Sequence, residues 1–545
     1  MKRRVLRAIV RARRLKKYAA RLKPVRLWAF AVIIGAAAAY GVIAFRWAID
    51  AISMFAFGAN ELMLASGAAA LSVERAWAAP VIGGCVVSAI LFLADRYNWL
   101  PQGRAQAVAD VIEARAVKDG RISLRTGITA AVVSAISLGA GGSAGREGPA
   151  VHLGATIASL LDRRFGFSLK DRRTLIGCGA AAAVAASFNA PIAGVLFALE
   201  VIMGSYALSV FGPIAAASVA AAIITRMHLG DNPAFAAPEY GPIYNIDPLL
   251  SAGLGIVSGL VATAFLLSTE EMTVRVRAYA DRFEFPYVLL PPLGGVAIGL
   301  IGVFYPEVFG VGYEAVSNAL AGAYTLRFIV IVLALKILAT AITLSFRFGG
   351  GVFSPGLMVG AFTGAAFGMI VNYISPDGTA SPAFYAMVGM GAACGAIMGA
   401  PISTTLIVFE MTGDYAMTIS LMVSVALATL VTQSIAGKSF FHWQLSRRGY
   451  DLSEGPQGVI LQTIRVQEVM DKMPVGSTPL TKDASRLLAE RSLGHALAKL
   501  EELDEDGLPV VRADEPNEIV GYLSRVKALA VYNRALIQSH VDYHK

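Results

Sequence analysis

The sequence predicts an all-α polytopic membrane protein that carries a small soluble α/β tail. Of its 545 residues, 56% are hydrophobic and only 16% are charged, and the mean hydropathy is +0.60. An average soluble domain is about 25% charged. Apolar segments of about 20 residues, the length that spans a bilayer, recur along the chain. Other apolar segments are short and interrupted by Gly and Pro, which is typical of transporter and channel cores. This composition excludes a purely soluble protein and a disordered one.

Residues 1–26 form a basic N-terminal segment. It contains twelve Lys and Arg residues and no acidic residue, so it carries a charge of +12, and the rest of the chain sums to +9 − 12 = −3. A basic flank of this kind predicts a cytoplasmic N-terminus. Nucleic-acid binding is the alternative, but no recognition motif follows, and we expect no nucleic-acid partner. The next segment, Leu27–Phe57, is apolar and too long for a cleaved signal peptide.

The membrane-embedded part is predicted over residues 27–449. A clear span at Ala76–Ala94 is followed by four broken apolar pieces: Thr126–Gly139, Pro149–Leu161, Thr174–Ser187 and Pro191–Met203. Each is shorter than the roughly 17 residues that a spanning helix needs. Half-helices that begin inside the membrane present free N–H groups and a positive dipole end, which suit an anion. Further apolar segments follow at Leu249–Leu267, Val288–Phe304, Phe328–Phe346, Gly356–Val371, Phe384–Met398, Ile402–Phe409 and Ala416–Ile435.

The chain contains an internal repeat. Asn189–Glu200 and Gly399–Glu410 share Ala-Pro-Ile near the start, then Leu, and Glu at the end. Farther upstream, Gly145–Pro149 followed by Gly154-Ala155 matches Phe353–Pro355 followed by Gly360-Ala361. We therefore expect two structural repeats, at about 76–226 and 286–436, with a site at their interface.

Two glycine-rich loops carry the chemistry. Gly141–Pro149 places Glu147 at a predicted helix start inside apolar sequence. Its carboxylate can occupy an anion site made of backbone N–H groups and leave that site on protonation, and an intramembrane carboxylate is a functional candidate by default. The alternative is a helix-capping glutamate paired with Arg146. Gly349–Pro355 is a second loop of the same kind, and the amides of Val352 and Phe353 are expected to face the same anion.

These motifs resemble those of the CLC family of chloride channels and proton–chloride exchangers, over residues 27–449. The resemblance implies a CLC-type inverted-repeat bundle with broken half-helices, assembled as a homodimer with one pore in each subunit. It identifies Glu147 as the gating residue, and it implies that Lys336 is the lysine typical of the family. The anion path it implies includes Gly145, Arg146, Gly148, Val352 and Phe353.

Three positions depart from the family pattern. Gln106 stands where the family has a filter serine, and Phe441 stands where it has a filter tyrosine. A Gln amide can still donate to an anion, whereas a Phe ring cannot, so the preferred anion is open. Val201 replaces the inner glutamate of the exchangers, which favours a channel.

The preferred interpretation is transmembrane transport of chloride or a similar small anion through a passive channel, gated by voltage or pH at Glu147. The alternative is proton-coupled chloride antiport. A nucleotide-driven enzyme or pump is a third reading, but no Walker motif, metal cluster or Ser/His/Asp set supports it. We expect no enzymatic activity and no cofactor. The expected partners are a small anion, protons, the lipid bilayer and a second copy of the chain.

Residues 450–545 are predicted to form a cytoplasmic α/β tail. Leu508–Val511 and Ile519–Ser524 read as strands, and the tail resembles a CBS domain. Adenine-nucleotide binding stays open as an alternative, although Lys527 stands where nucleotide-binding modules have an aspartate. The whole chain is expected in the cell (inner) membrane, with both termini cytoplasmic.

Overall fold

The computed structural model describes residues 2–100, 103–105, 107–231, 240–450, 461, 464–472, 485–514 and 518–544, and its side chains between residues 25 and 536. The chain divides into two compact units, Met1–Phe441 and His442–Lys545. This division lies close to the predicted limit at residue 450.

Eight helices in the described residues are long and apolar enough to cross a bilayer. The first, α1, begins at Lys2, so the basic segment and the first span form one continuous helix. Five of the eight are whole helices: α3 (Val73–Arg96), α9 (Leu208–Leu229), α10 (Asp247–Arg282), α13 (Leu326–Ser345) and α14 (Phe353–Ile374). The other three are Val25–Phe57 of α1 (Lys2–Phe57), Tyr287–Phe304, in which a single turn leads into α11 (Leu290–Phe304), and Tyr415–Ser446, which begins with α17 (Tyr415–Ala436).

Shorter helices lie between these spans. They are α2 (Leu64–Ala69), α4 (Val108–Ala116), α5 (Leu124–Gly139), α6 (Glu147–Phe165), α7 (Leu169–Phe188), α8 (Pro191–Phe197), α12 (Tyr313–Leu320), α15 (Pro382–Met398), α16 (Pro401–Thr412) and α18 (Phe440–Ser446). Single turns occur at η1 (Glu61–Met63), η3 (Tyr287–Leu289) and η4 (Pro306–Val308), and η2 (Ala198–Met203) is a π-helix that continues α8.

Two of the predicted short pieces are longer than expected. The sequence places them at Pro149–Leu161 and Thr174–Ser187, but α6 has 19 residues and α7 has 20. Both helices extend into charged residues near the turn that joins them. Hydropathy does not predict these helical residues, because they are not apolar. The difference arises because polar contacts, not burial of apolar side chains, hold these helix ends.

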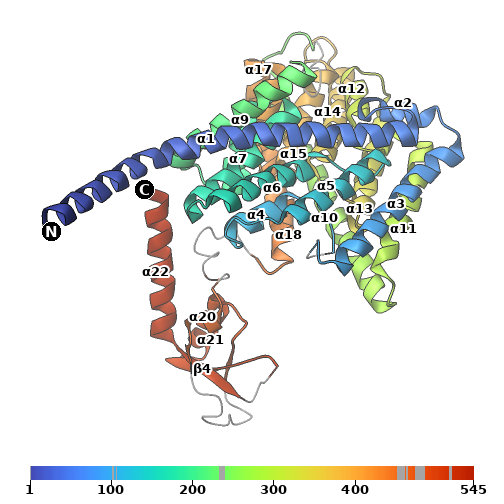
Figure 1. Ribbon diagram of the computed structural model, residues 1–545. Coiled ribbons are helices and arrows are strands. Elements are labelled where there is room, and N and C mark those ends of the chain that lie inside the picture. The colour runs from blue at the N-terminus through green and yellow to red at the C-terminus, as the bar shows by residue number, and fades with distance from the viewer. Residues whose placement is uncertain are drawn as a thin grey trace. The chain divides into compact units, whose positions relative to one another are not determined.

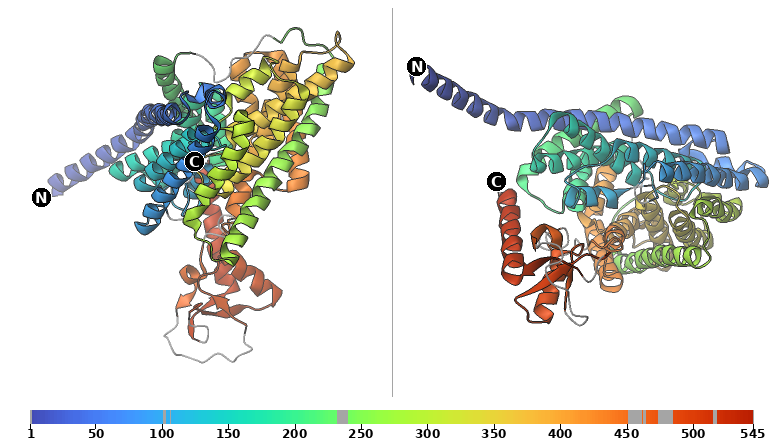
Figure 2. Two further views of the ribbon diagram at one scale, coloured as in Figure 1. Left: turned by 90° about the vertical axis from the view of Figure 1, so that its right-hand side faces the viewer. Right: turned by 60° about the horizontal axis from the view of Figure 1, so that its bottom comes forward.

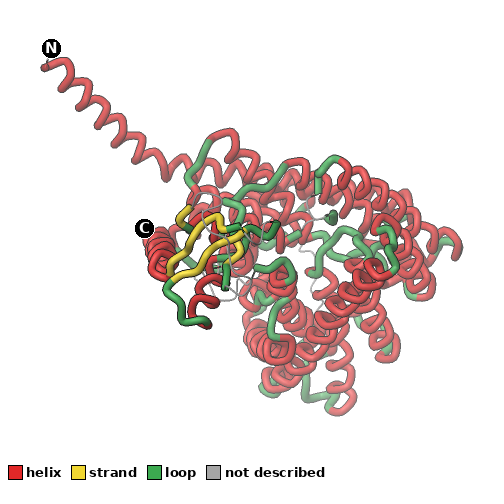
Figure 3. Tube along the Cα trace, turned by 90° about the horizontal axis from the view of Figure 1, so that it is seen from below, coloured by secondary structure: helices red, strands yellow, loops and turns green. Residues whose placement is uncertain are grey.

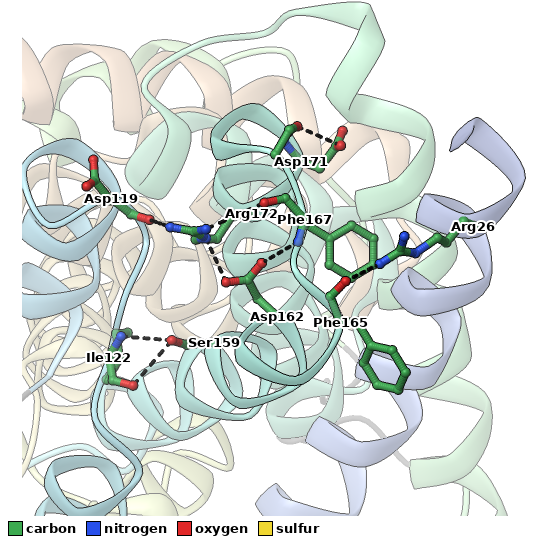
Figure 4. A network of polar contacts seen from close by, with 10 residues as sticks. Arg26, Asp119, Ile122, Ser159, Asp162, Phe165, Phe167, Asp171 and Arg172 are labelled. Atoms are coloured by element: carbon green, nitrogen blue, oxygen red, sulfur yellow. Dashed lines mark hydrogen bonds and ion pairs between the residues drawn. The ribbon is translucent and has the colours of Figure 1, made fainter. Parts of the chain in front are cut away.

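Figure 4 shows the network at this turn. Asp162 near the end of α6 forms an ion pair with Arg172 of α7 at 2.6 Å and accepts the Phe167 N–H at 3.1 Å. Arg26 of α1 donates to the Phe165 carbonyl at 2.5 Å, and its guanidinium lies over the Phe167 ring. These contacts fix α1, α6 and α7 at one end of the bundle.

The helices pack largely within two groups. In Figure 1, α1 runs beside α7 and α9, and α6 packs on α7. In the second group α14 packs on α15 and α10 packs on α17, and Figure 2 shows α10, α11 and α13 side by side. The groups meet where equivalent helices touch, α3 against α11 and α8 against α16.

The crossing of α3 and α11 is reciprocal. A Cβ at Gly84 would lie 2.5 Å from the Pro291 carbonyl oxygen, and a Cβ at Gly295 would lie 2.3 Å from the Pro80 carbonyl oxygen. Both helices carry a proline four residues before the contacting glycine. Small residues allow membrane helices to approach this closely. Both halves therefore use the same feature, a glycine that contacts the backbone of the other helix.

The second unit contains the only named strands of the described residues, which Figure 3 draws in yellow. They form one sheet in the order β1-β4-β3-β2, and the predicted strands correspond to β3 and β4. Lys527 forms an ion pair with Asp471 of β1. The elements of this unit are α20 (Val466–Val469), β1 (Asp471–Lys472), β2 (Leu487–Leu488), α21 (Leu493–Glu502), β3 (Gly507–Val511), β4 (Ile519–Ser524) and α22 (Arg525–His544).

Candidate functional site

The two glycine-rich loops meet in the first unit. The Gly145 N–H donates to the Gly351 carbonyl, and the Gly351 N–H donates to the Gly145 carbonyl, both at 2.7 Å. A Cβ at Gly148 would lie 3.2 Å from the Gly351 Cα, which is tighter than an ordinary side chain tolerates. Helices α6 and α14 therefore begin next to each other, one from each half of the chain.

A third helix, α4, begins at the same place. A Cβ at Gly148 would contact the Ala107 Cβ at 3.4 Å. Asp110 accepts the Ala107 N–H at 2.9 Å and pairs with Arg104, which fixes the start of α4. The first N–H groups of a helix have no intrahelical acceptor and can bind an anion. The predicted filter residue Gln106 lies outside the described residues.

The Glu147 side chain lies at the junction of the loops and is 1% exposed. The Ser354 hydroxyl of α14 donates to its Oε2 at 2.5 Å, and the Tyr313 hydroxyl of α12 donates to its Oε1 at 3.1 Å. Both donors come from the second half of the chain, whereas the carboxylate comes from the first. The carboxylate therefore receives hydrogen bonds from two hydroxyl groups, as a bound anion at this position would.

A turn before α12 positions Tyr313. Gly312 has φ +92°, and the buried Lys336 ammonium donates to the carbonyls of Val308 and Gly310 at 3.1 and 2.9 Å. Lys336 therefore holds the backbone of the turn instead of reaching the membrane surface. The sequence analysis did not identify Tyr313, because no motif surrounds it.

The Arg146 side chain pairs mainly with a different carboxylate. Its guanidinium forms an ion pair with Glu61 of η1 and lies 4.8 Å from the centroid of the Tyr313 ring. The Glu147 Oε1 is farther away, 3.8 Å from the Arg146 Nε. Arg146 is 4% exposed and Glu61 is 3% exposed, and removing one partner of such a buried pair would leave an uncompensated charge. The Glu61 carboxylate is a second acid near the gate, and the sequence analysis missed it.

Val352 and Phe353 form the start of α14. The Phe353 side chain is buried and packs on Phe188 and Phe197, with ring centroids 4.8 and 6.2 Å apart. Their aromatic packing fixes the backbone of the loop, and the first amides of the helix remain available to an anion.

For two predicted site residues, Phe441 and Val201, the contacts described in the structure do not include Glu147. Phe441 is buried on α18, where its ring contacts Phe440. Val201 lies in η2, and Arg115 of α4 donates to the carbonyls that end this π-helix, to Ile202 at 2.9 Å and to Met203. A cation thus caps the segment in which the exchangers of the family would carry their inner glutamate.

The repeated glutamates cap each other's helices. Glu200 accepts the N–H groups of Ile402 and Ser403 at the start of α16, at 3.1 and 2.8 Å. Glu410 accepts the N–H groups of Ile192 and Ala193 at the start of α8, at 2.9 and 2.7 Å. Both are structural links between the halves. The described residues contain no group of three or more His, Cys, Asp or Glu side chains that could hold a metal ion.

Comparison with known proteins identifies the family. Residues 84–433 match the model of the voltage-gated chloride channel family. A putative chloride channel protein, ClcB-like, of Ralstonia nicotianae is 33% identical over 427 residues, which cover 78% of this chain and 97% of that relative. The voltage-gated ClC-type chloride channel ClcB of Escherichia coli O81 is 28% identical over 416 residues, which cover 75% and 96%.

Solved structures agree with this assignment. The crystal structure of a slow cyanobacterial Cl−/H+ antiporter is 25% identical with a TM-score of 0.68, and the match covers 78% of this chain and 98% of that one. A CLC-type fluoride/proton antiporter shares the fold at 23% identity and a TM-score of 0.62, over 76% and 97% of the two chains. The chain therefore belongs to the voltage-gated chloride channel (CLC) family and is an integral membrane protein.

Proposed function

We propose that this chain exchanges chloride, or a similar small anion, for protons, and that the Glu147 carboxylate is both the gate and the proton carrier. One observation carries the proposal. The carboxylate occupies the junction of the two glycine loops and accepts hydrogen bonds from Ser354 and Tyr313, as an anion there would.

The mechanism follows from competition for one place. When Glu147 binds a proton, it loses the charge that the hydroxyl donors and the helix N-termini stabilise, and its side chain leaves. An anion then enters and accepts the same hydrogen bonds. When the anion departs, Glu147 releases its proton and returns. Because carboxylate and anion cannot occupy the place together, each cycle links anion movement to one protonation.

Different observations support proton-coupled exchange and passive conduction. The related solved structures are described as Cl−/H+ and fluoride/proton antiporters, which supports exchange. The burial of Glu147 also supports it, since an anion cannot pass without moving the carboxylate. A passive channel is the second candidate. The absence of a carboxylate at Val201 favours it, and the relatives ClcB of E. coli and R. nicotianae carry the name of chloride channels.

Exchange therefore requires protons to reach Glu147 by a route that does not use residue 201. We also propose that the chain works as a homodimer in the cell membrane with both termini in the cytoplasm, and that it is a transporter and not an enzyme.

Flux measurements in liposomes test the proposal. Purified protein is reconstituted with a chloride gradient, the voltage is clamped with valinomycin, and chloride efflux and external pH are recorded together. We expect chloride to drive protons against their gradient in the wild type. Glu147→Gln should move chloride without protons, and Glu314→Gln, which removes a carboxylate one residue from Tyr313, should keep the coupling. Chloride flux without proton movement in the wild type would establish the channel instead.

A further inference from the structure

A small cavity lies beside Arg146, the residue that precedes Glu147. It is enclosed by residues of α1, α6, α7 and the end of α9, and α1, α7 and α9 lie together in Figure 1. Most of its wall is apolar, for example Val42, Ile43 and Ala150. Three polar side chains line it, Arg46, Arg146 and Ser187.

Two of these three polar side chains, Ser187 and Arg46, have no hydrogen-bond acceptor among the described residues, whereas Arg146 pairs with Glu61. Ser187 is 93% buried, being 7% exposed, and its hydroxyl has no hydrogen-bond partner among the described residues. Nor does the structure give Arg46 a hydrogen-bond acceptor in the described part of the chain. A buried hydroxyl without a partner costs free energy. The partly buried Arg46 side chain adds a second donor, so this site suits a group that accepts hydrogen bonds.

The charges around the cavity indicate which group this is. Arg46 and Arg146 lie within electrostatic range of each other and repel. The nearest carboxylates, Asp50 and Glu61, do not line the cavity. Glu61 is engaged with Arg146, and Asp50 accepts the Glu61 N–H at 3.0 Å. Two arginines, whose guanidinium groups only donate, and one serine, whose hydroxyl can donate, line one space without a carboxylate in its wall. This arrangement favours an anion.

The size of the cavity limits the anion. Its volume is about 10 Å³, close to the space that a single water-sized group needs. A monatomic halide is the only common anion near this size, and the long Arg46 side chain can adjust to its radius. A phosphate, a carboxylate ligand or a nucleotide does not fit.

We infer that this cavity is a second anion site, which holds one halide between Arg46, Arg146 and Ser187 before it reaches the gate. The inference rests on the proposed function, since it adds a loading position to the same anion path. Arg146 connects the two places, because it lines the cavity and its Nε lies 3.8 Å from the Glu147 Oε1. A halide held there waits next to the position that Glu147 vacates.

Flux titrations test the role of the site. Arg46→Gln removes the positive charge that attracts the halide, and Ser187→Ala removes the hydroxyl that donates to it. We expect each to raise the chloride concentration for half-maximal flux, by about tenfold for Arg46→Gln and less for Ser187→Ala, while the proton coupling persists. Arg46→Lys should restore much of the affinity. The matched control is Arg226→Gln, which removes an arginine at the end of α9 that pairs with Asp231 outside the cavity, and it should leave the titration unchanged.

Diffraction from bromide-soaked crystals tests the position of the ion without any transport assay. We expect an anomalous peak within hydrogen-bond distance of the Ser187 Oγ, which Arg46→Gln removes. A cavity without bromide, a peak that is indifferent to Arg46, or an unchanged titration in both Arg46→Gln and Ser187→Ala would each overturn the inference. A wild type that moves no chloride would reject the proposed function, while the diffraction result would still decide whether the site binds a halide.

Discussion

The two halves of the membrane unit have equivalent backbone contacts and helix caps but differ in the charges of their side chains. Gly145 and Gly351 exchange hydrogen bonds, and Glu200 and Glu410 cap each other's helices. The aligned side chains beside the glycines are not equivalent. The first half supplies Arg146 and Glu147, and the second supplies Val352 and Phe353. The pairing of backbones thus builds one place for an anion, and the asymmetry puts a single carboxylate in it.

The second half contributes the donors that receive this carboxylate. Ser354 and Tyr313 both follow glycine-containing turns of the second half, and both hydrogen-bond to Glu147 of the first. Neither half contains the site alone. Changes that alter the shared devices should therefore affect the fold, and changes that alter the unequal side chains should affect transport.

The largest effect is expected where the loops touch. A Cβ at Gly351 would lie 3.2 Å from both the Cα and the N of Gly148, so Gly351→Ala must push the loops apart. Such overpacking costs about 1–3 kcal/mol, and we expect chloride flux to fall as well, because the two loops that form the anion place must move apart by a few tenths of an ångström. The control is Gly253→Ala in α10, where the new Cβ makes only a 3.8 Å contact. Thermal unfolding and liposome flux measure both effects, and equal behaviour of the two variants would contradict the account.

The two capping glutamates should contribute unequally to stability, Glu200 more than Glu410. Glu200 accepts a third hydrogen bond, from the Ser403 hydroxyl, whereas the equivalent position in the first half is Ala193. We expect Glu410→Gln to lower the free energy of unfolding by about 1–2 kcal/mol and Glu200→Gln to lower it more. Ser403→Ala should bring the two effects together in a double-mutant cycle. If Glu410→Gln proved the more damaging change, the hydrogen-bond count would not explain the caps.

The two donors to the gate should set its pH response. Ser354→Ala removes a charge-assisted hydrogen bond that favours the ionised carboxylate, so protonation and flux should begin at higher pH. A bond of this kind corresponds to a shift of about one pH unit in half-maximal flux. Tyr313→Phe removes the longer bond of 3.1 Å and should shift the midpoint in the same direction by less. A downward shift in either variant would mean that the donor stabilises the protonated gate.

The smallest effect concerns the last helix of each half. Asp414 caps α17 and accepts the N–H groups of Ala416 and Met417, whereas the residue that precedes α9, Ala207, provides no side-chain cap. The hydrogen bond from the Tyr240 hydroxyl, with the helix N–H groups, lowers the pKa of Asp414 below its usual range. The stabilisation is therefore present above the ordinary Asp pKa of about 4 and is lost as the pH falls below it. Asp414→Ala should cost about 1 kcal/mol at pH 7 and almost nothing at pH 2. An equal cost at both pH values in denaturation curves would reject this assignment.

The sequence predicts those parts of the site that local patterns encode. Glycines, a proline and a carboxylate in one short loop indicate Glu147 and its approach to a helix start, and the repeat indicates that Glu200 and Glu410 are equivalent. It does not predict that each glutamate caps the other half, since that link joins residues more than 200 positions apart. Tyr313 and Glu61 were missed for the same reason, because only the folded chain brings them to Arg146 and Glu147.

The fold shows the same division. Hydropathy and the repeat predict the helical class, and two short runs joined by a polar turn predict strands β3 and β4. The lengths of α6 and α7 were wrong because polar contacts hold their ends. The reciprocal contacts of Gly84 and Gly295 depend on a crossing between helices, which no single segment reveals.

Counting bound chloride tests the central claim most directly, that the Glu147 carboxylate and the anion occupy one place. Equilibrium dialysis against radioactive chloride at neutral pH gives the number of ions per chain for the wild type, for Glu147→Gln and for the control Glu314→Gln. The account predicts one more bound chloride per chain in Glu147→Gln than in the other two proteins. Equal numbers in all three would show that the carboxylate does not hold the place of an anion.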